Sequence, residues 1–199
     1  HDHFDHLDKQ SVARLVKNNP RMKLFCGLGT GELIKSWFPE LEVTEAGWYQ
    51  QIEDDRLKIT FLPAQHWSKR SVRDGGRRLW GAFMVQGDGI SIYYSGDTGY
   101  SRHFREIPEL FGTPDYALVG IGAYKPRWFM QPNHISPYDA LTASTDMKAA
   151  LTIPMHYGTF DLSDEPLHDP PQVFAAEAKK RRIDVYIPVL GEIVKLKRM

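Results

Sequence analysis

The opening stretch His1-Asp2-His3-Phe4-Asp5-His6 decides how the rest of the sequence is interpreted. It holds four side chains that can bind a metal ion, His1, His3, Asp5 and His6. His1 and His3 stand two residues apart, so in extended chain both imidazoles can point to the same side. Asp5 and His6 come where a helix is about to begin and can face a neighbouring position. One short loop could therefore serve two divalent metal ions about 3.5–4 Å apart.

A histidine-rich start can also be a tag remnant or an ordinary solvated loop. Asp2, Phe4 and Asp5 interrupt the histidines, whereas tags are plain histidine runs. The sequence opens on His1 without an initiator Met, and we expect that something upstream was removed or lies outside this chain.

The composition is ordinary for a soluble globular protein, with 42 % apolar and 25 % charged residues. A length of 199 residues suits one domain over 1–199. Lys+Arg and Asp+Glu balance at 25 each, which offers no general attraction to nucleic acid, so none is expected as a partner. The single cysteine, Cys26, excludes an intrachain disulfide and is expected to be a small buried hydrophobe at the end of a strand.

No run of 18 or more apolar residues and no signal peptide are found in the sequence, so no transmembrane helix is expected. The composition fits a reducing compartment. A cytoplasmic protein, either free or in peripheral contact with a membrane, is the resulting expectation.

Hydrophobic periodicity and turn residues predict alternating strands and helices. We expect helices at 8–18, 32–38, 103–111, 137–149 and 172–181, and strands at 22–26, 41–44, 47–52, 56–62, 79–86, 90–95, 116–121, 151–155 and 184–196, the last as a pair broken by Gly191. Asp8 and Ser136 are the expected helix N-caps, and Gly87-Asp88-Gly89 is the expected hairpin turn. The polar, basic stretch 68–78 is expected to be an exposed loop. These elements predict a mixed α/β layered fold.

Each further candidate ligand follows one of the predicted strands. His66 follows strand 57–62, Asp97 follows strand 90–95, and His156 follows strand 151–155. Loops at one edge of a sheet are where a rigid scaffold presents functional groups. Taken alone each residue is a weak signal, because a lone His is usually packed or solvated and Asp-Thr-Gly is often only a turn. With the opening motif they make a set of five His and two Asp, the composition of a two-metal site.

The order HxHxDH, a lone His, an Asp after Gly and a final His resembles the ligand pattern of the metallo-β-lactamase superfamily. Within it, four segments are similar to N-acyl-phosphatidylethanolamine phospholipase D-like proteins. They are Pro-Ala-Gln-His-Trp (63–67), Ser-Gly-Asp-Thr-Gly-Tyr (95–100), Gly-Ala-Tyr-Lys-Pro-Arg-Trp-Phe-Met (122–130) and His-Tyr-Gly-Thr-Phe (156–160). The resemblance runs from His1 to about Phe160, and 122–130 is its most specific part.

The resemblance implies an αββα sandwich with the metal ions at the edge between two β-sheets. The implied ligands are His1, His3 and His66 for one metal ion, Asp5, His6 and His156 for the other, and Asp97 bridging both. Zinc is the expected metal, with manganese and iron as alternatives. The family's strands before HxHxDH are missing from this sequence, so we expect part of the sandwich to be absent from the chain.

The implied reaction is hydrolysis of a phosphodiester, of phospholipase D type, in an N-acyl-phosphatidylethanolamine-like lipid or another small molecule. A water that bridges the two ions would have its pKa lowered towards ~7 and would attack the phosphorus. Asp97, Asp5 and His134 are the expected catalytic residues. His134 matches an active-site histidine of the family and could hydrogen-bond a phosphoryl oxygen or assist the leaving group. A helix-capping or surface histidine is the alternative for His134.

Several assignments stay open at this level. The same ligands serve hydrolases of lactones, other esters and thioesters, and a non-catalytic metal-binding scaffold is a third hypothesis; neutral charge gives no support to a nuclease. Trp128-Phe129-Met130 is a buried loop, a wall of the substrate cleft or a lipid-facing edge, with Lys125 and Arg127 near a phosphate. His103 and His168 are expected at the surface. The sequence does not predict the oligomeric state.

Overall fold

Most strands belong to one mixed sheet, which we call the main sheet. In the computed structural model, which describes residues 1–54 and 56–198, its strand order is β3-β4-β5-β6-β7-β8. The strands are β3 (Gln51–Asp54), β4 (Leu57–Leu62), β5 (Ala82–Gly87), β6 (Ile90–Tyr94), β7 (Tyr116–Gly120) and β8 (Leu151–Met155). β3 to β6 pair antiparallel, whereas β6, β7 and β8 pair parallel. The carboxyl ends of β4, β6, β7 and β8 therefore meet at one edge of the main sheet.

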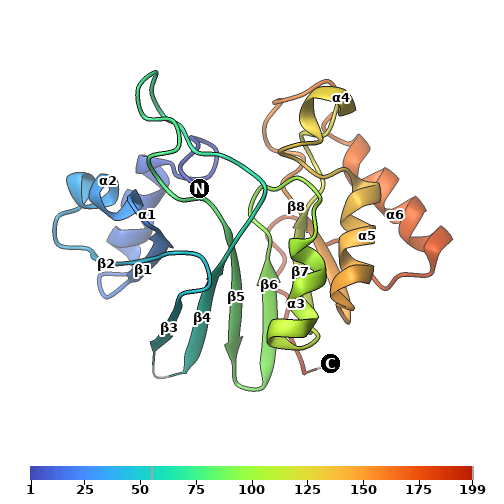
Figure 1. Ribbon diagram of the computed structural model, residues 1–199, viewed down its shortest axis with the longest axis horizontal. Helices are drawn as coiled ribbons and strands as arrows, with labels where there is room; N and C mark the ends of the chain where they lie inside the picture. Colours follow the sequence, from blue (N-terminus) through green and yellow to red (C-terminus); the bar gives the residue numbers. More distant parts are fainter. Residues whose placement is uncertain (55, 199) are drawn as a thin grey trace.

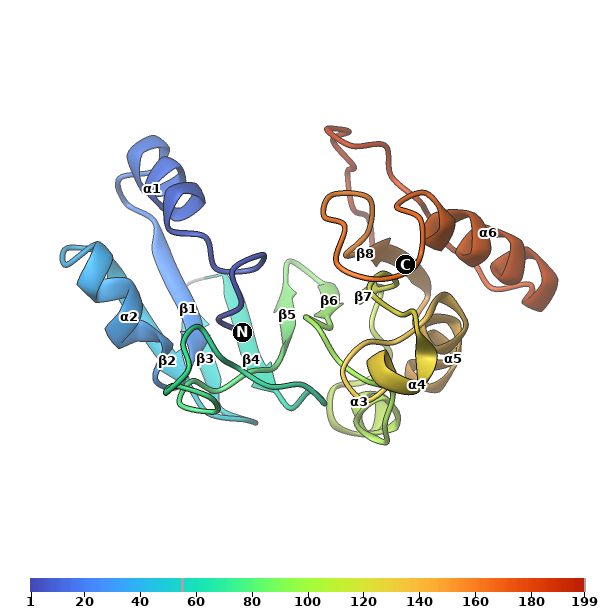
Figure 2. The ribbon, with the colours of Figure 1, turned by 90° about the horizontal axis from the view of Figure 1, so that it is seen from above.

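Three longer helices accompany the β6–β8 end of the main sheet, as Figures 1 and 2 show. They are α3 (His103–Phe111), α5 (Pro137–Met147) and α6 (Asp169–Arg181), and the short α4 (Arg127–Met130) precedes α5. Tyr93, Phe104, Leu141 and Phe174 are fully buried between these helices and the strands. This larger core gives the sheet edge a rigid support.

A second unit lies beside the β3–β4 end, and we call residues 1–46 the N-terminal layer (Figure 2). It contains α1 (Lys9–Asn18), β1 (Lys23–Gly27), α2 (Thr30–Trp37) and β2 (Glu42–Ala46). β1 and β2 pair parallel, with α2 as the crossover. Its own core consists of Leu7, Val12, Cys26, Ile34 and Leu41. Cys26 is buried in the last part of β1, as the sequence predicts.

Local signals in the sequence placed several element boundaries correctly. The Asp8 carboxylate accepts a hydrogen bond from the backbone N–H of Ser11 and caps α1. Ser136 and Asp139 form a reciprocal capping box at the start of α5. The turn between β5 and β6 has positive φ at Asp88 (51°) and Gly89 (75°), as a tight hairpin requires.

The predicted strand pair at 184–196 is wrong. In the described residues 182–198 no strand forms, and only an isolated bridge joins Val185 to Thr152. The alternation that suggested a strand has another cause, because Ile183, Val185 and Ile187 pack against the larger core. Period-2 burial alone does not require a neighbouring strand.

Other boundaries differ by a few residues. α6 begins at Asp169 instead of 172, because Pro170 at the first turn needs no backbone donor. α5 ends at Met147 instead of 149, because Lys148 adopts a left-handed conformation (φ 55°). None of the helices in the described residues combines the length and apolar character that crossing a membrane demands.

Candidate metal centre

The structure brings all seven predicted ligands to one place. His66, Asp97 and His156 follow β4, β6 and β8 at the common carboxyl edge of the main sheet. The chain's opening loop lies beside the same edge, near the upper ends of the strands in Figure 1. Potential ligand atoms lie within 4.8 Å of one another in three groups, namely His1, His3 and His66; Asp5, His6, Asp97 and His156; and His66, Asp97 and His134.

Asp97 lies at the centre of this cluster and is 5 % exposed. Its Oδ2 is 3.1 Å from His6 Nε2 and 3.6 Å from His1 Nε2, both in the opening loop. Its Oδ1 is 3.3 Å from His156 Nε2. Burial alone would raise the pKa of Asp97, but the hydrogen bond with His6 and the nearby histidine charges hold that pKa below its usual range. Asp97 is therefore an anion that faces both halves of the site.

Asp5 provides the second carboxylate. Its Oδ2 is 3.4 Å from His6 Nε2 and 3.5 Å from His156 Nε2. Burial works to raise the pKa of Asp5, and the contacts with His156 and His6 outweigh it and lower that pKa. This side of the site thus pairs two anions with two imidazoles.

The other half of the site, across Asp97 from Asp5, contains only imidazoles, those of His1, His3 and His66. His66 Nε2 lies 3.3 Å from His3 Nδ1. Burial lowers the pKa of His66 to about 3 and also lowers that of His3, so both rings are neutral, the form that binds metals. The Nε2 atoms of His1 and His3 are buried without a hydrogen-bond partner. Buried nitrogens without a partner are costly, and a cation held between these rings would satisfy them.

Contacts behind the site fix the loops that carry these groups. His66 Nδ1 lies 3.1 Å from the carbonyl of Asn133, which orients the ring. The hydroxyl of Thr98 accepts a hydrogen bond from the backbone N–H of Gln65 at 2.9 Å. The Gln65 amide in turn donates to the carbonyl of Pro132. Sequence reasoning missed Thr98 and Gln65 as supports, because their partners lie tens of residues away along the chain.

His134 lies between α4 and α5 and belongs to the cluster. Its Nδ1 is 3.8 Å from Asp97 Oδ2, and its ring stacks on that of His156. Burial lowers the pKa of His134. The alternatives of a helix-capping or a surface histidine do not describe this position.

His103 differs from its sequence expectation. It is 7 % exposed, packed against Phe104, and its Nδ1 lies 3.0 Å from Ser101 Oγ. Burial lowers the pKa of His103 to about 4, so it is neutral. Its polar neighbours in sequence misled the prediction, because α3 turns this side inward. His168 is exposed, as expected.

An apolar groove of about 580 Å³ opens directly from the cluster. Asp5 and His156 line it together with residues 157–160, 162, 163, 165, 167, 170 and 188–192. Its lining includes the exposed apolar side chains of Phe160, Leu162, Val189 and Leu190.

Two backbone features shape the floor of this groove. His156 has a positive φ of 59°, which is unusual for a residue with a side chain. A Cβ atom added at Gly122 would come within 2.0 Å of the His156 carbonyl oxygen. The close approach of these two residues therefore depends on glycine at 122.

Residues 125–130 do not form a wall of this groove. Trp128 and Phe129 are 78 % and 62 % exposed, so they are neither a buried loop nor among the groove residues. Lys125 pairs with Asp169 at 3.3 Å, and Arg127 pairs with Asp139 at 2.8 Å. The two cations next to the aromatic pair thus have carboxylate partners within the fold.

Comparison with known proteins identifies the family. A family model described as the beta-lactamase superfamily domain matches residues 1–157. The chain belongs to this superfamily. The mixed α/β fold and the metallo-β-lactamase expectation from the sequence are confirmed.

Relatives of this superfamily member differ in length. It is 34 % identical over 198 residues to "N-acyl-phosphatidylethanolamine-hydrolyzing phospholipase D 1" of Caenorhabditis elegans, covering 93 % of this chain and 54 % of the worm protein. It is 32 % identical over 199 residues to a metal-dependent hydrolase of Sulfurisphaera tokodaii, covering 98 % and 78 %. The chain thus spans about half the length of the first curated relatives that it matches.

A solved structure agrees with the fold of this superfamily member. Igni18, a metallo hydrolase from Ignicoccus hospitalis, superposes with a TM-score of 0.76 at 23 % identity. The superposition covers 99 % of this chain and 78 % of Igni18. At this identity the likeness shows the shared fold alone.

Proposed function

We propose that the chain is a metal-dependent hydrolase with a binuclear centre that cleaves phosphodiesters. The observation that carries this proposal is the position of Asp97, whose carboxylate lies within 4.0 Å of histidines from both the opening loop and the main sheet. One buried anion between two sets of imidazoles is the arrangement expected of a bridging ligand. Relatives named as metal-dependent hydrolases support the reaction class.

The residues present fit two divalent ions. His1, His3 and His66 would hold one, Asp5, His6 and His156 the other, and Asp97 both. Nitrogen and carboxylate donors suit zinc first, with manganese and iron as alternatives. When bound, the ions would supply Lewis acidity and a water acidic enough to ionise near neutral pH.

The protein's own groups would then place the substrate and move a proton. His134 is close enough to Asp97 to reach a phosphoryl oxygen bound over the centre. There its N–H would donate a hydrogen bond to that oxygen or to the departing alkoxide. Asp5, which lines the groove, would help to orient the attacking water as well as serve as a ligand.

The substrate class follows from the groove. A phosphodiester over Asp97 would have its apolar portion beside Phe160 and Leu162, and the groove volume of about 580 Å³ is that of a site for a sizeable ligand. We therefore propose a lipid phosphodiester of the N-acyl-phosphatidylethanolamine type. The worm relative's name supports this choice. Exposed Trp128 and Phe129 are side chains suited to meet a lipid surface.

A substrate panel tests the proposal. Purified protein of measured zinc content is assayed with bis(p-nitrophenyl) phosphate, N-acyl-phosphatidylethanolamine in vesicles, a lactone and a thioester. We expect turnover of both phosphodiesters and a lower KM for the lipid. If the lactone or the thioester is hydrolysed faster than both phosphodiesters, the proposed substrate class is wrong. Bound metal without any hydrolysis would mean a metal-binding scaffold.

A further inference from the structure

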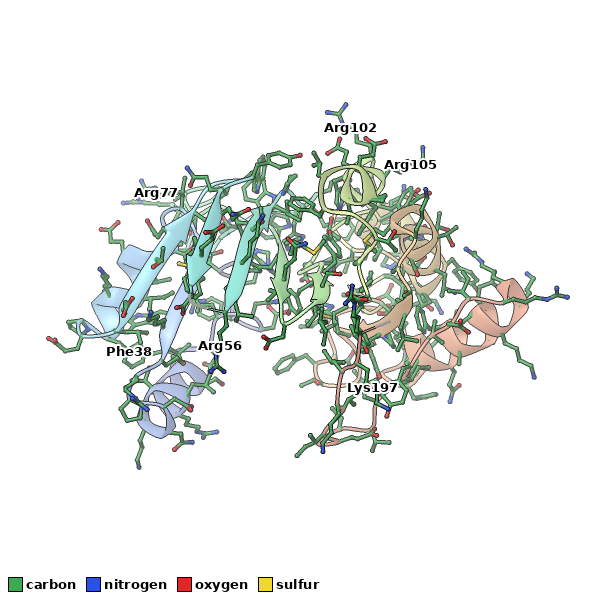
Figure 3. All side chains as sticks on the ribbon, turned by 90° about the horizontal axis from the view of Figure 1, so that it is seen from below. Phe38, Arg56, Arg77, Arg102, Arg105 and Lys197 are labelled. Atoms are coloured by element: carbon green, nitrogen blue, oxygen red, sulfur yellow. The ribbon has the colours of Figure 1, made fainter. Side chains whose placement is uncertain are left out.

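The basic loop 68–78, expected from its sequence to be solvated, is partly turned inward. Figure 1 shows it beside the N-terminus. Arg73 and Arg77 are exposed, and Figure 3 places Arg77 on the outside of the molecule. Arg70 and Arg78 behave differently, because both reach the opening loop that carries His1, His3, Asp5 and His6.

Arg78 binds a carboxylate buried in the opening loop. Its Nη1 donates to Asp2 Oδ2 at 2.8 Å and to Asp74 Oδ2 at 2.9 Å. The backbone N–H of Lys69 donates to the other oxygen of Asp2. Asp2 is 0 % exposed, so an ionised carboxylate between His1 and His3 depends on partners from the basic loop.

Arg70 makes the complementary contacts to the backbone. Its Nη1 donates to the carbonyl oxygens of Asp2 and Leu7, at 2.6 and 2.8 Å. These two carbonyls stand on either side of residues 3–6. The guanidinium also lies over the Phe4 ring, 3.9 Å from its centroid. The Asp74 carboxylate accepts from the backbone N–H of Arg70 and so gives the loop its shape.

We propose that Arg70 and Arg78 are positioning residues that hold the opening loop in the geometry its ligands need. This proposal rests on the metal centre of the proposed function. The need is physical, because residues 1–3 lie in neither helix nor strand and their imidazoles have to converge on His66 and Asp97. Partners behind metal ligands commonly affect metal affinity by about 10–100-fold.

The contacts of Arg70 and Arg78 favour a role in holding the opening loop over a role in stabilising the whole fold. Both arginines bind at Asp2, and Arg70 also binds the Leu7 carbonyl, whereas the small core of the N-terminal layer extends from Leu7 through α1, β1 and α2. Losing Arg78 would therefore release His1 and His3 first and leave that core in place. The larger core lies apart from these contacts.

Zinc binding by the full chain, measured by competition with a chromophoric chelator, tests the proposal. We expect Arg78→Ala to raise the Kd for Zn²⁺ by about 10–100-fold. Arg78→Lys should recover much of the affinity, because a single nitrogen of Arg78 contacts both carboxylates. Arg73→Ala, an exposed arginine of the same loop, is the matched control and should bind as the unaltered chain does.

Circular dichroism of each metal-free variant reports folding separately. Folded Arg78→Ala with the Kd of Arg73→Ala would overturn the proposal. If Arg78→Ala does not fold, Asp2→Asn takes its place, since it keeps the side-chain shape and removes the charge that Arg78 binds. Unchanged zinc affinity in Asp2→Asn would overturn the proposal equally.

The two proposals fail in different ways. If the affinity order holds but the unaltered, zinc-loaded chain hydrolyses no member of the substrate panel, the positioning role stands and the proposed function fails. If phosphodiesters are hydrolysed while all variants bind zinc alike, only the positioning role fails.

Discussion

The N-terminal layer and the main sheet bring ligands to the same site by different routes. The opening loop holds four candidate ligands within six residues of sequence. The main sheet holds three, His66, Asp97 and His156, which lie far apart in sequence and meet only because β4, β6 and β8 end at one edge. The first set is visible in the sequence directly, whereas the second becomes a set only through sheet topology.

The supports of the two sets also differ in size. The core of the N-terminal layer contains five buried apolar residues, while the larger core next to β6–β8 contains Tyr93, Phe104, Phe174 and many others. Small cores bury a smaller fraction of their surface and open more readily. We therefore expect the opening loop to be the weaker half of the site and the more dependent on the basic loop.

Replacing Asp97 should have the largest effect of any single change, because this carboxylate contacts histidines from both the opening loop and the main sheet. We expect Asp97→Ala to abolish phosphodiester turnover, a loss of at least about 10³-fold in kcat/KM. Steady-state kinetics on protein of known metal content measures it, with Asp184→Ala, an exposed aspartate, as the control. Full activity in Asp97→Ala would refute the assignment of the centre.

His134 belongs to neither ligand set in the proposal, so its loss should leave both intact. We expect His134→Ala to reduce kcat by about 10²–10⁴-fold, the range for loss of a proton donor or acceptor. Metal content, measured by elemental analysis, should stay that of the unaltered chain. A loss of metal would instead make His134 a ligand together with His66 and Asp97. The exposed His168→Ala is the control.

Matched substitutions in the two cores compare how strongly each core stabilises its region. Ile34 lies in the small core and Ile107 in the larger one, and both are buried in helices. Each Ile→Ala change should cost about 2–5 kcal/mol. We expect hydrogen exchange in Ile34→Ala to accelerate mainly in β1, α2 and β2, whereas Ile107→Ala should lower the stability of the main sheet. Equal acceleration throughout both variants would show that the two regions open as one.

The alkylation rate of the Cys26 thiol reports local opening of the N-terminal layer, and this is the smallest effect that we expect. Burial raises the pKa of its thiol to about 12, so at neutral pH the thiol stays protonated and unreactive. We expect its alkylation to be about 10²-fold slower or more in the native protein than in denaturant. The rate is measured by mass spectrometry, and Ile34→Ala should increase it. Native alkylation as fast as that of the denatured chain would contradict the buried position.

The sequence predicted those parts of the molecule that depend on neighbours along the chain. The caps at Asp8 and Ser136 and the turn at Asp88 need only a few adjacent residues, and they were correct. The cluster of seven candidate ligands was anticipated because four of them stand in one six-residue motif and the other three follow predicted strands.

Features that depend on distant partners were not predictable. Arg70 and Arg78 resemble ordinary surface arginines until Asp2 is placed beside them. His103 has polar neighbours in sequence, yet α3 turns it inward. Residues 183–187 alternate because they cover the larger core, and the same alternation in a strand would look identical. In each case the deciding partner lies on another element.

The close approach of Gly122 to the His156 carbonyl constrains any redesign of the groove. A library that alters ligand preference can vary Phe160 and Leu162, which are partly exposed and free of backbone strain. Position 122 should be kept constant in such a library. A side chain introduced there would displace His156, a proposed metal ligand, before it met the new ligand, so lost activity in such clones would carry no information about specificity.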